Sequence, residues 1–392
     1  MSQLSGPALP PSPSVHAALL RSLWPVAVCI VLAVAAKFWI GPAVGPFNAR
    51  VMMDVGIAIM LAASLNIVNG FAGQFSIGHA GFLALGGYTA GAVTYYGSLW
   101  LWGDAAIKPG WLGPGEQLFA MGCLAGGLVA AAAGYLVGLP TLRLRGDYLA
   151  IATLGFGEII RVLLQQTNNV IYSAEALKSA TAEQLFPPPL GGSLGFSGIP
   201  GYTNLFWVTL FAAITVLATH RLKHSSAGRA LLSIREDEVA AQAMGVNTTR
   251  LKIRAFVYSA FFAGIAGGLF AHRIGVIISP RDAGFQRSID LVIMVVLGGM
   301  GSVSGVVIAA AVLTILPELI RGLGNYPAVT NAMGNLGIGD PGRFIDQYRL
   351  VLYALLLVLM MILRPKGIFG VREIWDYFPR RLRTLLRAGA KP

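Results

Sequence analysis

Long apolar runs separated by short polar connections dominate the chain. A helix needs about 20 apolar residues to cross the hydrocarbon core of a bilayer, so each run predicts a membrane span. The predicted spans cover residues 22–40, 51–69, 77–97, 118–140, 146–165, 203–221, 253–273, 288–301, 303–320 and 349–365. The pattern predicts an all-α polytopic membrane protein with about ten transmembrane helices.

Glycines change this picture in two ways. The sequence Gly298-Gly299-Met300-Gly301 separates the eighth and ninth runs, which form either two short helices or one span and a re-entrant segment. If two glycine-rich segments fail to cross, about eight spans remain. Elsewhere, glycines four residues apart open grooves that let neighbouring helices pack closely. Such pairs are Gly87/Gly91, Gly122/Gly126, Gly134/Gly138, Gly264/Gly268 and Gly301/Gly305.

Composition and charge agree with a membrane location. The 392 residues are 55% hydrophobic and 12% charged, about half the charged fraction of a soluble domain. The net charge of +12 would suggest nucleic-acid binding in a soluble protein. Here lysines and arginines gather in a few connections and in the C-terminal tail, so the positive-inside rule explains them better and predicts both termini in the cytoplasm. Cys29 and Cys123 lie in apolar runs and predict no disulfide.

The chain divides into three predicted parts. Residues 1–21 are rich in Ser and Pro and predict a disordered cytoplasmic leader, residues 22–365 form the membrane domain, and residues 366–392 form a basic cytoplasmic tail. The first apolar run also resembles a signal peptide. Only Arg21 flanks it on the N-terminal side and further spans follow, so an uncleaved first helix is favoured.

Residues 66–81 interrupt the apolar pattern with polar side chains and several glycines. Unpaired polar groups are costly in hydrocarbon, so this stretch predicts a helix break or tight turn, buried in protein or beside a wet cavity. Two interpretations stay open: the polar side chains line a translocation path, or they only hydrogen-bond neighbouring helices. The candidates are Asn66, Asn69, Gln74, Ser76 and His79.

Glu158 and Arg161 place opposite charges three residues apart inside a predicted span. This spacing puts both side chains on one helical face, where they can form an ion pair. A charged pair within a span is a candidate for the translocation path, although a structural intrahelical pair is slightly favoured. Lys37, Asp54 and Asp290 also lie in or near spans, and the sequence assigns them no specific role.

The predicted cytoplasmic loop over residues 222–252 reads as two short helices. Asp237 is suited to cap the second helix, Gly245 to end it, and Asn247 to cap the next span. Leu231, Leu232, Ile234, Val239 and Met244 give the loop an apolar face. A docked amphipathic element of this kind favours binding to a partner protein. A helix lying on the bilayer would carry fewer acidic residues than this loop does.

Motifs of soluble enzymes are missing from the sequence. No Gly-Lys dipeptide occurs, so the chain lacks a P-loop lysine and is not expected to bind ATP itself. The five histidines are scattered and form no metal-binding pattern with cysteines, and no metal or other cofactor is expected in this chain. An intramembrane hydrolase would depend on Ser76 and His79, which lack a third orienting group.

Five segments of the chain form a distinctive series: LNIVNGFAGQFSIGHAGFLALGGYTAG (65–91), GDYLAIATLGFGEIIR (146–161), GRALLSIREDEVAAQAMGVNTTRLKIRAFVYSAFFAGIAGGL (228–269), VVLGGMGSVSG (295–305) and LRPKGIFG (363–370). Together, and in this order, they resemble the LivM-type permeases of branched-chain amino acid ABC importers. The resemblance covers most of residues 50–370.

The resemblance implies a type II importer-like permease of ten helices, with a coupling loop between the sixth and seventh. It implies a LivH-like second permease subunit, two LivG/LivF-like cytoplasmic ATPases that bind ATP and Mg, and a periplasmic amino-acid-binding protein that supplies selectivity. Membrane lipid is the remaining partner. Contact with the ATPases is implied for Gly228, Arg229, Arg235, Glu236, Asp237, Glu238, Ala241, Met244 and Gly245.

Three alternatives remain at this stage. A related ABC permease for urea, short amides or other small acids would share the same scaffold. A secondary transporter would also contain broken helices but would not need a docked cytoplasmic loop. The third is the intramembrane hydrolase. The chain departs from the family in its longer leader and in loops near 100–116, 172–202 and 321–348, all predicted outside, where a binding protein would dock.

Overall fold

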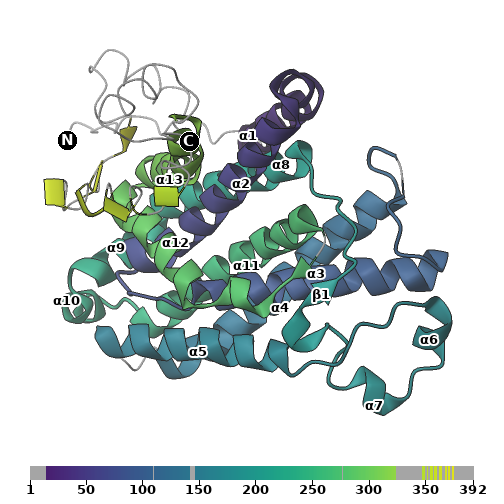
Figure 1. Cartoon of the computed structure of the whole chain (residues 1–392). Coiled ribbons are helices and arrows are strands. Elements are labelled where there is room, and N and C mark those ends of the chain that lie inside the picture. The colour runs from purple at the N-terminus through teal and green to yellow at the C-terminus, as the bar shows by residue number, and fades with distance from the viewer. Residues whose placement is uncertain are drawn as a thin grey trace, which may run out of the picture.

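The computed structural model describes residues 15–108, 110–141, 146–275 and 277–323, with scattered positions between 347 and 374. Over these residues the protein is mostly helical. Figure 1 shows long helices running beside one another, with α9 (Ser226–Glu236) and α10 (Glu238–Ala243) at one end. The short helices α6 (Ala174–Lys178) and α7 (Ala182–Leu185) lie at the opposite end.

The long helices follow the predicted apolar runs. They are α1 (Val15–Ala35), α2 (Gly41–Asn66), α3 (His79–Trp102), α4 (Pro114–Thr141), α5 (Asp147–Gln165), α8 (Leu205–His224), α11 (Thr248–Ile274), α12 (Phe285–Gly298) and α13 (Val303–Leu323). Shorter elements are the π-helical turns η1 (Ala36–Ile40) and η2 (Ile67–Phe71), the 3₁₀ turns η3 (Gly192–Leu194) and η4 (Pro280–Ala283), and the antiparallel pair β1 (Phe196–Ser197) and β2 (Ile277–Ile278).

Helices therefore occupy the first nine predicted runs. The tenth, 349–365, falls on a stretch of which the structure describes only scattered positions. Five helical runs among the described residues are long and apolar enough to cross a membrane, so the total of ten spans stays a prediction. Helix α1 begins at Val15, within the last residues of the predicted leader, because Val15-His-Ala-Ala-Leu-Leu contains no helix-breaking residue; the leader's disorder stays a prediction.

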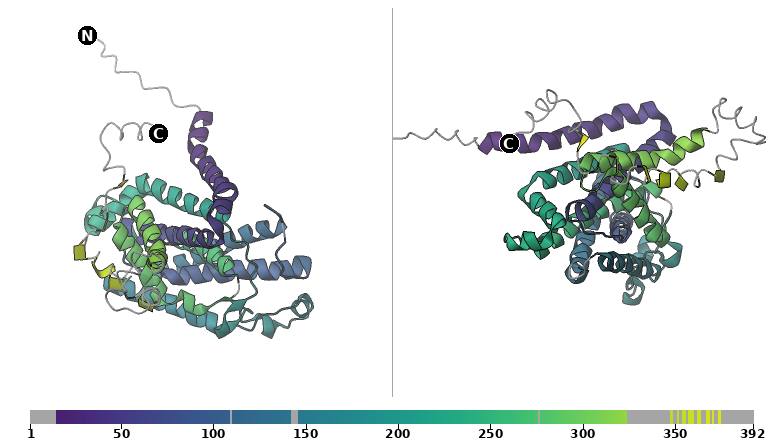
Figure 2. Two further views of the ribbon diagram at one scale, coloured as in Figure 1. Left: turned by 45° about the horizontal axis from the view of Figure 1, so that its top comes forward. Right: turned by 90° about the vertical axis from the view of Figure 1, so that its left-hand side faces the viewer.

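Residues Trp24–Phe71 form one helical run of 48 residues, where the sequence predicts two spans. The run is interrupted at Gly45, whose φ of 77° and ψ of 161° are not helical. Pro46 follows directly, and its ring cannot continue an undisturbed helix. Figure 2 shows α1 projecting crosswise to the main bundle instead of running alongside it. The break separates α1 from the part of α2 that enters the core.

Close packing of α3, α4 and α11 forms the centre of the bundle. A Cβ added at Gly86 would lie 2.1 Å from the carbonyl oxygen of Gly264, and one at Gly126 would lie 2.5 Å from that of Gly86. A Cβ at Gly268 would lie 2.9 Å from the sulfur of Cys123. The three helices thus meet at backbone distance, as the glycine spacing predicts.

Replacing Gly86 with Ala is expected to destabilise the protein, because the new methyl group would overlap backbone atoms that cannot move aside. Overpacking of this kind costs roughly 1–3 kcal/mol. The matched control is Gly155→Ala in α5, where a Cβ would meet nothing within 4 Å. Thermal unfolding in detergent should show a lower melting temperature for Gly86→Ala only. Equal melting temperatures would contradict backbone-distance packing.

Candidate functional site

The loop predicted to contain two short helices does contain them. The Ser225 side chain caps α9 by accepting a hydrogen bond from Gly228 N at 3.1 Å. Asp237 Oδ1 accepts bonds from the N–H groups of the first turn of α10, at 2.8 and 3.0 Å. Asn247 Oδ1 accepts from Arg250 N at 3.0 Å and caps α11. The predicted capping roles of Asp237 and Asn247 are confirmed.

The predicted apolar face of this loop is divided between two surfaces. Leu231 is buried with Ile67, Phe71 and other residues of the bundle, so α9 docks onto the helices beside it. Val239 and Met244 point the other way and are 65% and 84% exposed. The α9–α10 element is therefore fixed to the bundle on one side and presents apolar side chains on the other.

The residues that the resemblance assigns to ATPase contact also fall into two groups, one turned toward the bundle and one exposed. Gly228 and Ala241 are buried, and a Cβ at Gly228 would lie 1.9 Å from the carbonyl oxygen of Leu222. Glu238 pairs with Lys252 at 2.6 Å. These three residues shape the element from within. The exposed members of the set are Arg229, Glu236, Asp237, Met244 and Gly245.

The first predicted helix break lies directly beneath this element. After Asn66 the chain passes through the π-helical turn η2 and an extended stretch before α3 begins at His79. Asn69 closes the extended stretch, because its Oδ1 accepts from Ser76 N at 3.1 Å and its Nδ2 donates to Ser76 O at 3.4 Å. The Ile77 N–H donates to Thr153 Oγ1 at 3.1 Å. The prediction of a buried break is confirmed.

A second break separates α12 from α13 at residues 299–302. Gly299 and Gly301 have φ values of 99° and 93°, which favour glycine. The eighth and ninth runs are thus two separate helices, of which α13 is long and apolar enough to cross a membrane and α12 has 14 residues. Whether α12 crosses or is re-entrant stays open. Asn66 joins the two breaks: its Oδ1 accepts from Gly301 N at 2.9 Å and its Nδ2 donates to Ser302 O at 3.2 Å. We call residues 67–78 and 299–302 together the double break.

Arg235, at the end of α9, reaches into the double break. Its Nη1 donates to Gly70 O at 2.9 Å and to Met300 O at 3.2 Å, so one guanidinium bridges both interrupted helices. Gly73 has a φ of 65°, and a Cβ there would lie 2.7 Å from Arg235 Cγ. The contact joins two sets of candidates that sequence reasoning treated separately.

The predicted path residues of the first break are all buried. His79 Nε2 bonds Ser64 Oγ at 2.9 Å. Gln74 Oε1 is buried without a hydrogen-bond partner among the described residues. Internal packing roles are therefore observed for Asn66, Asn69 and His79, and a role in the translocation path stays a prediction.

Glu158 and Arg161 form the expected intrahelical pair, with Glu158 Oε2 at 2.6 Å from Arg161 Nε. Both side chains are partly exposed. Ile151, Ile159 and Leu163 on the same helix are exposed as well. Helix α5 thus presents an apolar surface with one ion pair that no described residue of the chain covers.

Sequence reasoning missed a contact from the C-terminal tail. The Glu373 carboxylate accepts hydrogen bonds from Val303 N at 3.0 Å and Ser304 N at 2.9 Å, at the start of α13, and it pairs with Lys223. Burial alone would raise the pKa of Glu373, but the bonds from Lys223, Ser304 and the backbone lower it to about 2. The tail therefore caps α13 at the double break.

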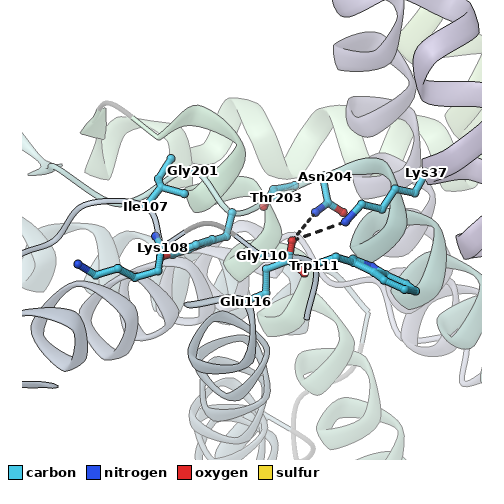
Figure 3. Close-up of a pocket in the computed structure, with 10 residues that line it drawn as sticks. Lys37, Ile107, Lys108, Gly110, Trp111, Glu116, Gly201, Thr203 and Asn204 are labelled. Atoms are coloured by element: carbon cyan, nitrogen blue, oxygen red, sulfur yellow. Dashed lines mark hydrogen bonds and ion pairs between the residues drawn. The ribbon is translucent and has the colours of Figure 1, made fainter. Parts of the chain in front are cut away.

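The opposite end of the bundle holds a cavity of about 300 Å³ centred on Glu116 (Figure 3). Glu116 Oε2 accepts from Leu112 N at 3.0 Å and its Oε1 accepts from Asn204 Nδ2 at 3.1 Å, with Lys37 Nζ at 3.8 Å. Lys108 N donates to the Tyr202 hydroxyl at 2.9 Å. These polar groups largely satisfy one another, so the network fastens the loop after α3 to the start of α8.

Comparison with known proteins adds independent information. A family model described as "Branched-chain amino acid transport system / permease component" matches residues 47–362. The chain is 33% identical over 375 residues to the high-affinity branched-chain amino acid transport system permease protein LivM of Salmonella typhimurium, covering 91% of this chain and 77% of that protein. Identity to LivM of Escherichia coli is 32%, with the same coverage.

A second kind of permease is also similar. The chain is 26% identical over 318 residues to LivH of Escherichia coli, covering 80% of this chain and 92% of that protein. No solved structure matches the chain.

Replacing Glu373 with Ala is expected to speed hydrogen exchange at the amides of Val303 and Ser304, because both donate to its carboxylate. Glu175→Ala, on exposed α6, is the control and should leave these amides unchanged. The carboxylate has a lowered pKa, so its contribution is present above about pH 4.5 and is lost as the pH falls toward about 2. The difference between wild type and variant should vanish over that interval, and a difference independent of pH would contradict the cap.

Proposed function

The chain belongs to the family of branched-chain amino acid transport permease components, and we propose that it is the LivM-type permease subunit of an ABC importer for leucine, isoleucine and valine. The observation that carries the proposal is the similarity to LivM over 91% of the chain. The protein is a multi-pass membrane transport subunit, and the substrate is proposed from the relatives that share the whole of this scaffold.

Ten spans with both termini in the cytoplasm are the topology that we propose, as in type II importers. Successive long helices run in alternating directions between the end that carries α9–α10 and the opposite end, which supports this arrangement. They are α2, α3, α4, α5, α8, α11, α12 and α13. The concentration of basic residues in the α9–α10 connection and in the tail supports a cytoplasmic location for that end. Residues 22–365 would form the membrane domain.

The α9–α10 element is the proposed coupling loop. Its buried side fixes it to the bundle, and its exposed side offers Val239 and Met244 to a partner. Arg235 then links the element directly to Gly70 and Met300. Movement of α9 would therefore act on both interrupted helices at once. ATP and Mg would be bound by two LivG/LivF-like partner subunits and not by this chain.

A LivH-like permease is the proposed second membrane subunit, since LivH proteins share the scaffold at 26% identity. The apolar surface of α5, which no described residue covers, is suited to such a neighbour. A periplasmic amino-acid-binding protein would dock on the loops at the opposite end.

The direct test is reconstitution of the chain with its second permease subunit, both ATPases and the cognate binding protein in liposomes. ATP-dependent uptake of labelled leucine is the expected result. Uptake of urea with no uptake of leucine, isoleucine or valine would overturn the substrate and retain the permease.

Arg235→Lys is expected to uncouple ATP hydrolysis from uptake, because the lysine side chain is one atom shorter and its ammonium would not reach the position from which Nη1 donates to both carbonyl oxygens. A hydrogen bond to a charged group contributes about 1.5–3 kcal/mol, so leucine uptake should fall by about an order of magnitude while the subunits stay assembled. The control Arg254→Lys, at an exposed position of α11, should transport normally. An unchanged ratio of leucine taken up to ATP hydrolysed would contradict the link.

Met244→Glu and Val239→Glu should each weaken co-purification of the ATPase subunits, because they place a charge on the exposed apolar surface. Leu194→Glu is the matched control, since Leu194 is equally exposed at the opposite end. Asp237→Asn, which keeps a capping oxygen for α10, separates loss of charge from loss of the helix. Undiminished co-purification by both Glu variants would place the ATPase contact elsewhere.

A further inference from the structure

Four charged side chains share a cavity of about 320 Å³ between α2, α11, α12 and α13. They are Asp54 of α2, Arg273 at the end of α11, and Arg287 and Asp290 in the first turns of α12. On α12, Arg287 and Asp290 lie in the half of the helix that is away from the double break, which follows Gly298. Charged residues among membrane helices mark functional sites by default.

The two arginines are held differently. Arg273 forms an ion pair with Asp54. Arg287 lies over the ring of Phe270, with its guanidinium carbon 5.3 Å from the ring centroid. The Nε atoms of both arginines are buried without a hydrogen-bond partner among the described residues. A buried N–H donor without a hydrogen-bond partner costs free energy unless a ligand or a water molecule accepts its hydrogen bond. The planar guanidinium group is suited to binding a carboxylate.

Apolar side chains form another wall of the same cavity. Ala58, Leu291 and Met294 line it and are buried. Asp290 stands one turn from Arg287 on the same helix, within electrostatic range of it, and its carboxylate also accepts a hydrogen bond from the Gln286 side chain. The cavity thus combines a cationic group, an anionic group and an aliphatic wall. A free amino acid with an aliphatic side chain has the complementary three parts: carboxylate, ammonium and hydrocarbon.

We propose that this cavity is a transient binding site for the transported amino acid. Arg287 receives the carboxylate, Asp290 receives the ammonium group, and Leu291 and Met294 contact the aliphatic side chain. The Asp54–Arg273 pair closes the site on the side of α2. Helix α12 carries the ligand-binding groups near one end and meets the double break at the other, so occupancy and coupling act on one helix. The inference rests on the proposed function and locates a substrate site within it.

The test is protection of a cysteine by substrate in the assembled transporter. Thr314, which lines the cavity, is replaced by Cys after Cys29→Ala and Cys123→Ala remove the two native cysteines. Labelling by methyl methanethiosulfonate is then followed with and without L-leucine. Labelling should slow at least about fivefold once leucine exceeds its dissociation constant about tenfold, because most sites are then occupied.

Two analogues test the chemistry of the site. Isocaproate lacks the ammonium group and isoamylamine lacks the carboxylate, so neither should protect at the leucine concentration that does. Equal protection by either analogue would overturn the assignment of paired charges. Met121→Cys, exposed on α4, is the labelling control and should not be protected by any of the three compounds.

Variants then identify the residues. Arg287→Gln and Asp290→Asn should abolish protection by leucine, whereas Arg281→Gln, six residues earlier and exposed, should retain it. Normal labelling at Met121→Cys in each variant establishes that the fold is intact. Protection that survives both Arg287→Gln and Asp290→Asn would overturn the proposal.

The outcomes separate this inference from the proposed function. ATP-driven leucine uptake without protection at Thr314→Cys would overturn the binding site and leave the importer in place. Protection without uptake of any branched-chain amino acid would support the site and remove the transport function. Loss of both would overturn the two together.

Discussion

Two interrupted helices leave backbone N–H and C=O groups without helical hydrogen-bond partners inside the bundle. The need to satisfy these groups governs how the surrounding elements are arranged. A buried N–H or C=O group without a partner costs several kcal/mol in an apolar surrounding. The Asn66 amide satisfies one donor and one acceptor of the second break, and Arg235 binds one carbonyl of each break. The Glu373 carboxylate caps the helix that follows. Each break is therefore stabilised by the other, by α9 and by the tail.

The glycine-packed helices and the double break are expected to differ in rigidity. In α3, α4 and α11, glycines such as Gly86 and Gly264 bring backbones into direct contact, and close-packed contacts of this kind transmit displacement without yielding. At the double break the contacts are single hydrogen bonds across two glycine-rich turns. Motion applied to α9 would therefore displace the two breaks and the helix ends beside them, while the glycine-packed core moves as a unit.

Helix α12 connects the two ends of the proposed mechanism. It has only 14 residues, begins beside the cavity with Arg287 and ends at Gly298, next to the double break. Arg235 bonds Met300, two residues after the end of α12, and the ligand-binding charges lie near the other end of this helix. Because α12 is short and rigid, a displacement at one end would move the other. The Glu116 network, by contrast, is closed by its own partners and fastens the opposite end of the bundle.

Helices, helix breaks and caps could be predicted from the amino-acid sequence, because they depend on residues that are close together along the chain. Apolar runs placed nine helices, glycines and polar residues placed the break after Asn66, and Asp237 and Asn247 were recognisable as caps, because propensity, capping and burial pattern are local. Which residues of separate helices contact one another could be learned only from the folded structure. Arg235 bonds a residue 165 positions away and Glu373 one 70 positions away. The folded structure also decided that Gly228 and Ala241 face inward while Met244 faces outward. Such contacts depend on how helices that are distant in the sequence pack against one another, and neither the charge nor the spacing of residues along the chain predicts that packing.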